Sequence, residues 1–214
     1  HKEYRRQRQM CIRDSLNGTC LVAVSKKHSV EKIMALYNEG HRDFGENFIQ
    51  ELVEKRKQLP KDINWHFLGN IQTNKIKLIA QHSSLIQSVG RTKVYNHLLK
   101  TGLEKEISIL LQLKLGHEDT KSGLTEKEII NIIEHHPEDS NVKVCGLMGI
   151  TENNISETER AEQFDQCNNL YNQIRVMNKN IEILSLGMSN DWEDAVKHGS
   201  TMIRIGTKIF GERK

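Results

Sequence analysis

The sequence has few of the residues that would mark a fibrous or membrane-embedded protein. Only two of its 214 residues are proline, which excludes a proline-rich or collagen-like chain. No apolar run approaches the roughly 20 residues that cross a bilayer, so no membrane-spanning helix is expected. The composition is 36% hydrophobic and 28% charged, which is typical of a globular protein with one core.

Cysteine is also scarce, and the spacing of the cysteines does not indicate a disulfide framework or a metal site. The four cysteines are Cys11, Cys20, Cys145 and Cys167. No pair has the C-x-x-C spacing, and none combines with a histidine at a zinc-binding spacing. We therefore expect reduced thiols, no metal site and a reducing compartment, for which the cytoplasm is the simplest choice.

Most of the chain has no excess of positive or negative charge. The net charge is +3, and residues 1–15 account for it with five basic and two acidic side chains. The remaining residues carry 26 of each sign. A nucleic-acid-binding surface needs positive charge clustered on the fold itself, so we expect no nucleic-acid partner.

Residues 1–15 are set apart from the fold argument as a basic tail. They lack the apolar segment of a secretory signal. Their sequence, especially QMCIRDS, is similar to translated adapter sequence, so a non-native start is one interpretation and a transit peptide is another. Residues 16–214 are expected to form one domain.

Apolar, β-rich runs alternate with helical patterns along that domain. Alternation of this kind favours parallel strands covered by helices. Eight such units predict a single (β/α)8 barrel of the TIM type. An open, doubly wound sheet is the alternative, but no G-x-G-x-x-G follows the first strand. The expected strands are residues 21–25, 42–44, 64–68, 85–89, 107–115, 142–150, 181–184 and 202–205.

The ends of these strands carry the residues of chemical interest, because barrels hold their sites at the carboxyl ends of the strands. Lys26 follows the first strand and could condense with an aldehyde, or could simply extend to solvent. The turns 185–189 and 204–207 follow the last two strands, where barrels often bind phosphate. An aldehyde and a phosphate together suggest pyridoxal 5'-phosphate (PLP), although ordinary tight turns would look the same.

Longer motifs extend this pattern over nearly the whole chain, from about Leu21 to Arg213. The sequence resembles the pyridoxal phosphate homeostasis protein family, whose fold is like the N-terminal barrel of alanine racemase. The motifs that carry the resemblance are A-V-S-K (23–26), D-F-G-E-N (43–47), W-H-F-L-G-N-I-Q-T-N-K (65–75), K-S-G (121–123), G-L-M (146–148), S-L-G-M-S (185–189) and G-S-T-M-I-R-I-G-T-K-I-F-G (199–211).

The resemblance implies a role for individual residues. Lys26 would form the internal aldimine with PLP, and Lys27, on the opposite side of the strand, is the minor candidate. The phosphate would be held by Ser189, Gly206 and Thr207. The full set of cofactor-binding residues implied is Lys26, Asn47, His66, Met188, Ser189, Arg204, Gly206 and Thr207, with Asn47 and His66 lining the mouth and Met188 packing nearby.

The resemblance also implies that Arg204 faces the pyridine nitrogen. A guanidinium there disfavours a proton on the ring and weakens carbanion chemistry. The racemase relatives also take a second base from another domain, for which we expect no room before Lys214. These points favour a PLP-binding protein over an enzyme, and the resemblance implies that it buffers or delivers the cofactor in vitamin B6 homeostasis. A racemase-like PLP enzyme is the alternative. Expected partners are PLP and PLP-dependent apo-enzymes, with a monomer or weak dimer as the assembly.

Overall fold

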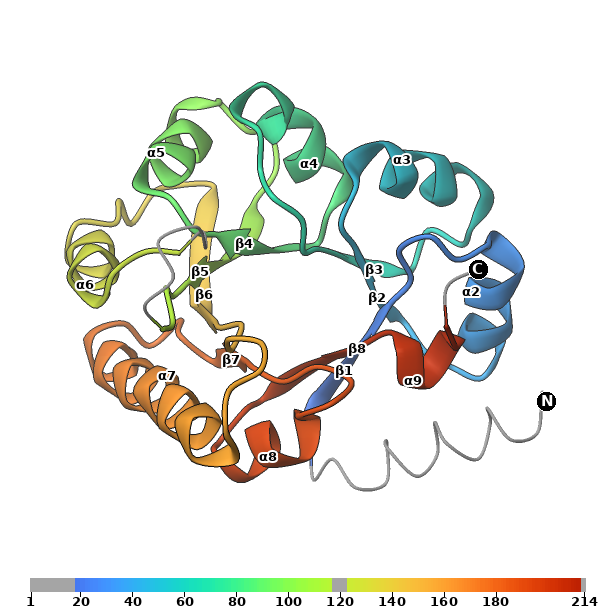
Figure 1. Ribbon diagram of the computed structural model, residues 1–214. Coiled ribbons are helices and arrows are strands. Elements are labelled where there is room, and N and C mark those ends of the chain that lie inside the picture. Colours follow the sequence, from blue (N-terminus) through green and yellow to red (C-terminus); the bar gives the residue numbers. More distant parts are fainter. Residues whose placement is uncertain (1–17, 117–122, 213–214) are drawn as a thin grey trace.

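A computed structural model describes residues 18–116 and 123–212 of the chain. Its strands form a closed, parallel barrel in sequence order, which β1 and β8 close by pairing with each other, and helices surround the barrel (Figure 1). The (β/α)8 prediction is confirmed. The strands are β1 (Cys20–Val24), β2 (Asp43–Glu46), β3 (Asn64–Phe67), β4 (Leu85–Val89), β5 (Ile107–Gln112), β6 (Val142–Met148), β7 (Ile183–Ser185) and β8 (Met202–Ile205).

The helices lie outside the barrel and turn apolar faces toward it. In α6, for example, Ile129, Ile132 and Ile133 are buried at the spacing of one helical face. The helical elements are α2 (Val30–Asn38), α3 (Ile49–Gln58), η1 (Thr73–Lys75), α4 (Ile76–His82), α5 (Thr92–Lys100), α6 (Glu126–Glu134), α7 (Glu157–Met177), α8 (Trp192–Lys197) and α9 (Thr207–Phe210).

Two apolar clusters follow from the alternation of side chains along the strands. The larger cluster packs between the strands and the helices and includes Trp65, Phe67 and Phe164. The smaller one consists of strand residues of the opposite register, which point inside the barrel: Val22, Leu85, Leu110, Met148 and Met202. The barrel is therefore a filled core, and its open end is where a ligand can bind.

The boundaries of six strands differ from the prediction, and only those of β4 and β8 agree with it. The fifth strand ends at Gln112, and the chain then forms an isolated bridge between Leu113 and Leu124. The sixth strand ends at Met148. The seventh begins at Ile183, since the Ile181 amide donates to Asn178 O in a turn after α7.

Two predicted features fall on residues whose structure is not described. They are the basic tail 1–15 and the first two residues of the K-S-G motif, Lys121 and Ser122.

Candidate functional site

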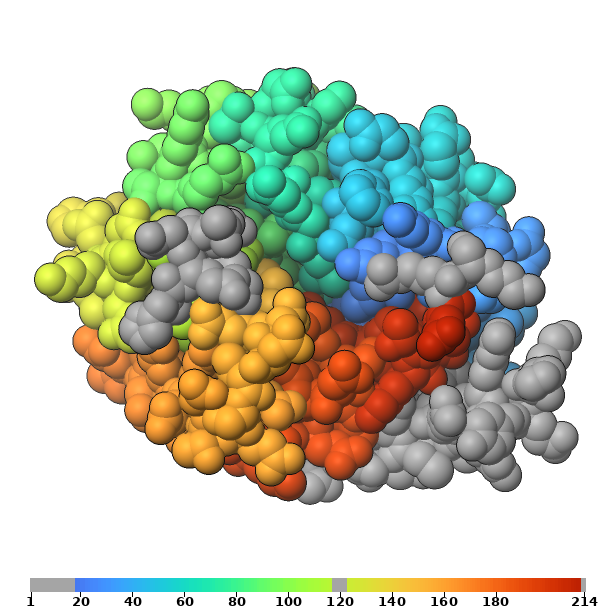
Figure 2. All heavy atoms as spheres, in the orientation of Figure 1, coloured from blue at the N-terminus to red at the C-terminus, as the bar shows by residue number. Residues whose placement is uncertain are grey.

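A cavity of about 710 Å³ opens at the carboxyl ends of the strands, within the size range of small-molecule sites. Figure 2 shows the orange segment after β6 and the red segment after β8 on the same face of the molecule. The cavity is lined by Val24, Lys26, Asn47, Leu68, Met148, Ile150, Thr151, Glu152, Asn153, Asn154, Ile155, Arg160, Met188, Ser189, Asn190, Asp191, Arg204, Gly206 and Thr207.

Seven of the eight residues predicted from the sequence line this cavity. They come from four different strand ends, after β1, β2, β7 and β8, or from β8 itself. The seven are Lys26, Asn47, Met188, Ser189, Arg204, Gly206 and Thr207. The structure therefore brings the amine and the candidate phosphate-binding turns to one place.

His66 is the residue that the structure places elsewhere. It lies within β3 and is 4% exposed. Its Nδ1 accepts a hydrogen bond from Gln87 Nε2 at 2.9 Å, and its Nε2 lies 3.2 Å from Asp43 Oδ1 at the start of β2. His66 therefore belongs to the barrel interior, and the cavity residue that follows β3 is Leu68.

The two lysines lie in the turn after β1 rather than on the strand. Lys26 is half-buried and lines the cavity, whereas Lys27 is exposed and does not line it. The different directions of the two side chains therefore arise from the turn, in which Lys27 has a φ of 61°, and not from strand alternation.

Arg204 is buried and its guanidinium is fixed by three hydrogen bonds. Nη1 donates to Ser185 O at 2.8 Å and to Ser185 Oγ at 2.6 Å, and Nη2 donates to Gly149 O at 2.9 Å. Burial lowers the pKa of Arg204 to about 10, although the charge of Asp191 acts in the opposite direction. Arg204 thus keeps its positive charge at neutral pH.

The turns after β7 and β8 contact each other at the cavity. The Gly206 N–H donates to Ser189 Oγ at 3.4 Å. The Met188 N–H donates to Asp191 Oδ1 at 2.6 Å, and Thr151 Oγ1 donates to Asp191 Oδ2 at 3.2 Å. Asp191 is a buried cavity residue that the sequence reasoning missed; its position just before a helix, typical of a capping residue, was the available signal.

The side chains present fit a ligand with polar groups. Asn47 lines the cavity, and its Oδ1 is buried without a hydrogen-bond partner among the described residues. A buried acceptor of this kind is costly unless a donor reaches it. Close packing fixes the Asn47 backbone, because a Cβ on Gly69 would lie 1.8 Å from Asn47 O.

Candidate metal ligands and thiols were compared over the part of the chain that the structure describes. Residues 18–116 and 123–212 contain no group of three or more His, Cys, Asp or Glu side chains suited to a metal ion. Cys20, Cys145 and Cys167 are free, and burial raises the pKa of each thiol. Within the same residues, no helix has both the length and the apolar character required to cross a bilayer.

The comparison with known families decides the classification. The family model described as "Alanine racemase, N-terminal domain" matches residues 4–214. The chain belongs to the alanine racemase N-terminal domain family. This confirms the resemblance found in the sequence.

Three known proteins illustrate how similar the chain is to its relatives. The pyridoxal phosphate homeostasis protein of Pasteurella multocida is 36% identical over 202 residues, covering 90% of this chain and 86% of the relative. PipY of Synechococcus elongatus, solved with PLP bound, superposes with a TM-score of 0.87 and 31% identity. The superposition covers 96% of this chain and 99% of PipY. An alanine racemase from Corynebacterium glutamicum has a TM-score of 0.78 but 16% identity, over 99% of this chain and 61% of the racemase, so that likeness shows the fold alone.

Proposed function

We propose that the protein binds PLP in the cavity at the carboxyl ends of the strands and acts in PLP homeostasis. The observation that carries the proposal is that Lys26 shares one cavity with Ser189, Gly206 and Thr207. The PLP-bound structure of PipY, 31% identical to this chain, supports the choice of ligand. A role in homeostasis is supported by the name of the relatives, pyridoxal phosphate homeostasis protein, and delivery of PLP to apo-enzymes is the further part of the proposal.

Lys26 is the proposed point of covalent attachment. Its neutral amine attacks the aldehyde carbon of PLP, a C=N bond forms, and the aldehyde oxygen leaves as water. The reaction needs no oxidant or reductant and is reversed by water, so the protein can release PLP unchanged. Reversibility suits a protein that stores or passes on its ligand.

The other cavity residues are proposed to hold the two ends of the ligand. Ser189, Gly206 and Thr207 supply hydroxyl and backbone donors for the phosphate. Arg204 faces the ring nitrogen, and Asn47 and Met188 contact the ring or its substituents. Because a guanidinium only donates hydrogen bonds, Arg204 disfavours a protonated ring and so weakens the electron sink that PLP enzymes use. This supports a binding role over an enzymatic one.

The covalent assignment is tested by trapping. The purified protein is incubated with PLP, reduced with borohydride and analysed by peptide mass spectrometry. We expect one PLP-sized adduct on Lys26, its loss in Lys26→Ala, and its retention in the neighbouring control Lys27→Ala. An adduct of equal yield in Lys26→Ala would refute the assignment.

The non-enzymatic role is tested with amino acids in deuterated water. We expect the PLP-loaded protein to exchange the α-proton of alanine no faster than free PLP does. Exchange at an enzymatic rate that Lys26→Ala abolishes would instead establish the racemase-like alternative.

A further inference from the structure

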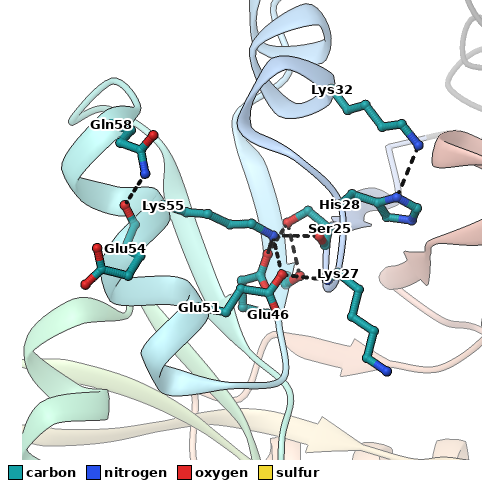
Figure 3. Close-up of polar contacts among 10 residues, drawn as sticks. Ser25, Lys27, His28, Lys32, Glu46, Glu51, Glu54, Lys55 and Gln58 are labelled. Atoms are coloured by element: carbon teal, nitrogen blue, oxygen red, sulfur yellow. Dashed lines mark hydrogen bonds and ion pairs between the residues drawn. The ribbon is translucent and has the colours of Figure 1, made fainter. Parts of the chain in front are cut away.

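Both residues that flank Lys26 are hydrogen-bonded to one charged cluster, which we call the turn cluster: Glu46, Glu51 and Lys55. Ser25 Oγ donates to Glu46 Oε1 at 2.6 Å, and Ser25 O accepts from Lys55 Nζ at 2.7 Å. On the other side, the Lys27 N–H donates to Glu51 Oε1 at 2.6 Å. The turn that carries Lys26 is therefore held at both ends (Figure 3).

Lys55 lies at the centre of the turn cluster. Its Nζ donates to Glu46 Oε1 and Glu51 Oε1, each at 2.7 Å, in addition to Ser25 O. These three bonds use all three protons of the ammonium group. The contacts join the end of β1, the end of β2 and the first two turns of α3, as Figure 3 shows.

The side chains of the turn cluster are largely shielded from solvent. The side chains of Lys55 and Glu46 are 7% and 0% exposed, and that of Glu51 is 23% exposed. A buried ion pair is weak evidence for stability, because desolvation opposes the attraction between the charges. The turn cluster is therefore better explained by the geometry that it imposes on the turn.

The backbone of the turn includes a conformation that is unfavourable without stabilising contacts. Lys27 has a φ of 61°, a left-handed conformation that a residue with a side chain adopts only at a cost. The bond from its N–H to Glu51 stabilises this conformation, and the conformation separates the directions of Lys26 and Lys27.

We propose that the turn cluster of Glu46, Glu51 and Lys55 acts as a positioning device that holds the Ser25–Lys27 turn so that the Lys26 amine is presented to the aldehyde of PLP. The inference rests on the proposed function, since it concerns the same lysine. None of the three cluster residues lines the cavity; they act through the turn. Correct placement of a reacting group speeds bond formation without any new contact to the ligand.

Glu51 offers the sharpest test because it is the partly exposed member of the cluster. Glu51→Ala removes the acceptor for the Lys27 N–H, whereas Glu51→Gln keeps an oxygen in its place. We expect borohydride-trapped adduct to form on Lys26 roughly tenfold more slowly in Glu51→Ala, the size of losing one hydrogen bond to a charged group. Glu51→Gln should recover most of the wild-type rate.

Glu54→Ala is the matched control on the same helix. Glu54 also pairs with a lysine, Lys57, at 2.7 Å, but both side chains are more than half exposed and neither contacts the turn. Its adduct should form at the wild-type rate. Equal rates in Glu51→Ala and wild type would overturn the inference while leaving the proposed function intact. Absence of a Lys26 adduct in the wild-type protein would instead refute the proposed function, and the inference with it.

A second measurement needs no PLP. Amide hydrogen exchange followed by NMR should show faster exchange at Lys27 in Glu51→Ala and unchanged exchange in Glu54→Ala. Circular dichroism and urea unfolding of the same samples establish that both variants are folded. Unchanged protection of the Lys27 amide in Glu51→Ala would also overturn the inference.

Discussion

At the scale of single residues, the backbone conformation of Lys27 could not be predicted from the sequence. A strand would have placed Lys26 and Lys27 on opposite faces, and the turn reaches a similar separation by a positive φ. Glycine adopts this conformation without strain, and a β-branched residue adopts it poorly.

Substitution of Lys27 tests the strain directly. In Lys27→Gly, the free energy of unfolding should be unchanged or raised by up to about 1 kcal/mol, because relief of strain offsets the greater freedom of the unfolded chain. In Lys27→Val, it should fall by about 1–2 kcal/mol. Urea unfolding measures both. A loss in Lys27→Gly as large as that in Lys27→Val would contradict the role of the positive φ.

The residues in and near the cavity differ in how well their positions could be predicted from the sequence. Lys26 and Gly206 directly follow predicted strands, and Ser189 lies in the turn after another, so barrel geometry alone brings them together. His66 is part of a recognisable motif, yet its position inside β3 depends on where that strand ends. The contacts of Gln87 with His66 and Ser185 join residues far apart in sequence, and no local pattern encodes them.

At the scale of elements, type and order were predictable and boundaries were less so. Apolar strands and amphipathic helices follow from periodicity. The end of β5 and the start of β7 depend instead on non-periodic contacts, the bridge between Leu113 and Leu124 and the turn after α7. The spacing of Thr125 and Glu128 predicts a capping box, and the structure has this box at the start of α6. A second one, Ser156 with Glu159 at the start of α7, has the same spacing and was missed.

The Ser156 capping box makes a prediction for α7. Ser156→Ala removes the hydroxyl that accepts from the Glu159 N–H at 3.2 Å, and the free energy of unfolding should fall by about 1 kcal/mol. Ser156→Asp keeps an acceptor at this position, so its free energy of unfolding should be close to that of the wild type. Thermal unfolding at neutral pH checks both variants. An equal loss of stability in Ser156→Ala and Ser156→Asp would contradict a capping role.

The same box has a defined pH dependence. Hydrogen bonds from the Ser156 backbone and side chain lower the pKa of Glu159 below its ordinary value of 4.5. The contribution of Glu159 is therefore complete above that value and is lost as the pH falls through the lower, folded-state pKa. The difference between wild type and Ser156→Ala should shrink in acid. A difference that grows below pH 4.5 would contradict this assignment.

At the scale of the whole molecule, a line of polar contacts crosses the barrel interior beside the smaller apolar cluster. It begins at Asp43 and His66, continues through Gln87 to Ser185, and ends at Arg204 in the cavity wall. Each contact joins a different pair of strands. Buried polar networks fix a particular arrangement when every member is satisfied, so this line ties the register of β2, β3, β4, β7 and β8 to the position of the Arg204 charge.

Gln87 is the link whose removal tests this role, because it bonds to both neighbours. Gln87→Leu leaves the His66 acceptor and the Ser185 hydroxyl without their partner, and the free energy of unfolding should fall by about 2–3 kcal/mol. Gln58→Leu is the control, since the exposed Gln58 side chain donates to Glu54 O on its own helix, and it should change stability by less than about 0.5 kcal/mol. In a double-mutant cycle, Ser185→Ala should cost less in the Gln87→Leu background than in the wild type. Additive losses would mean that Gln87 and Ser185 act independently and that the polar line does not work as one unit.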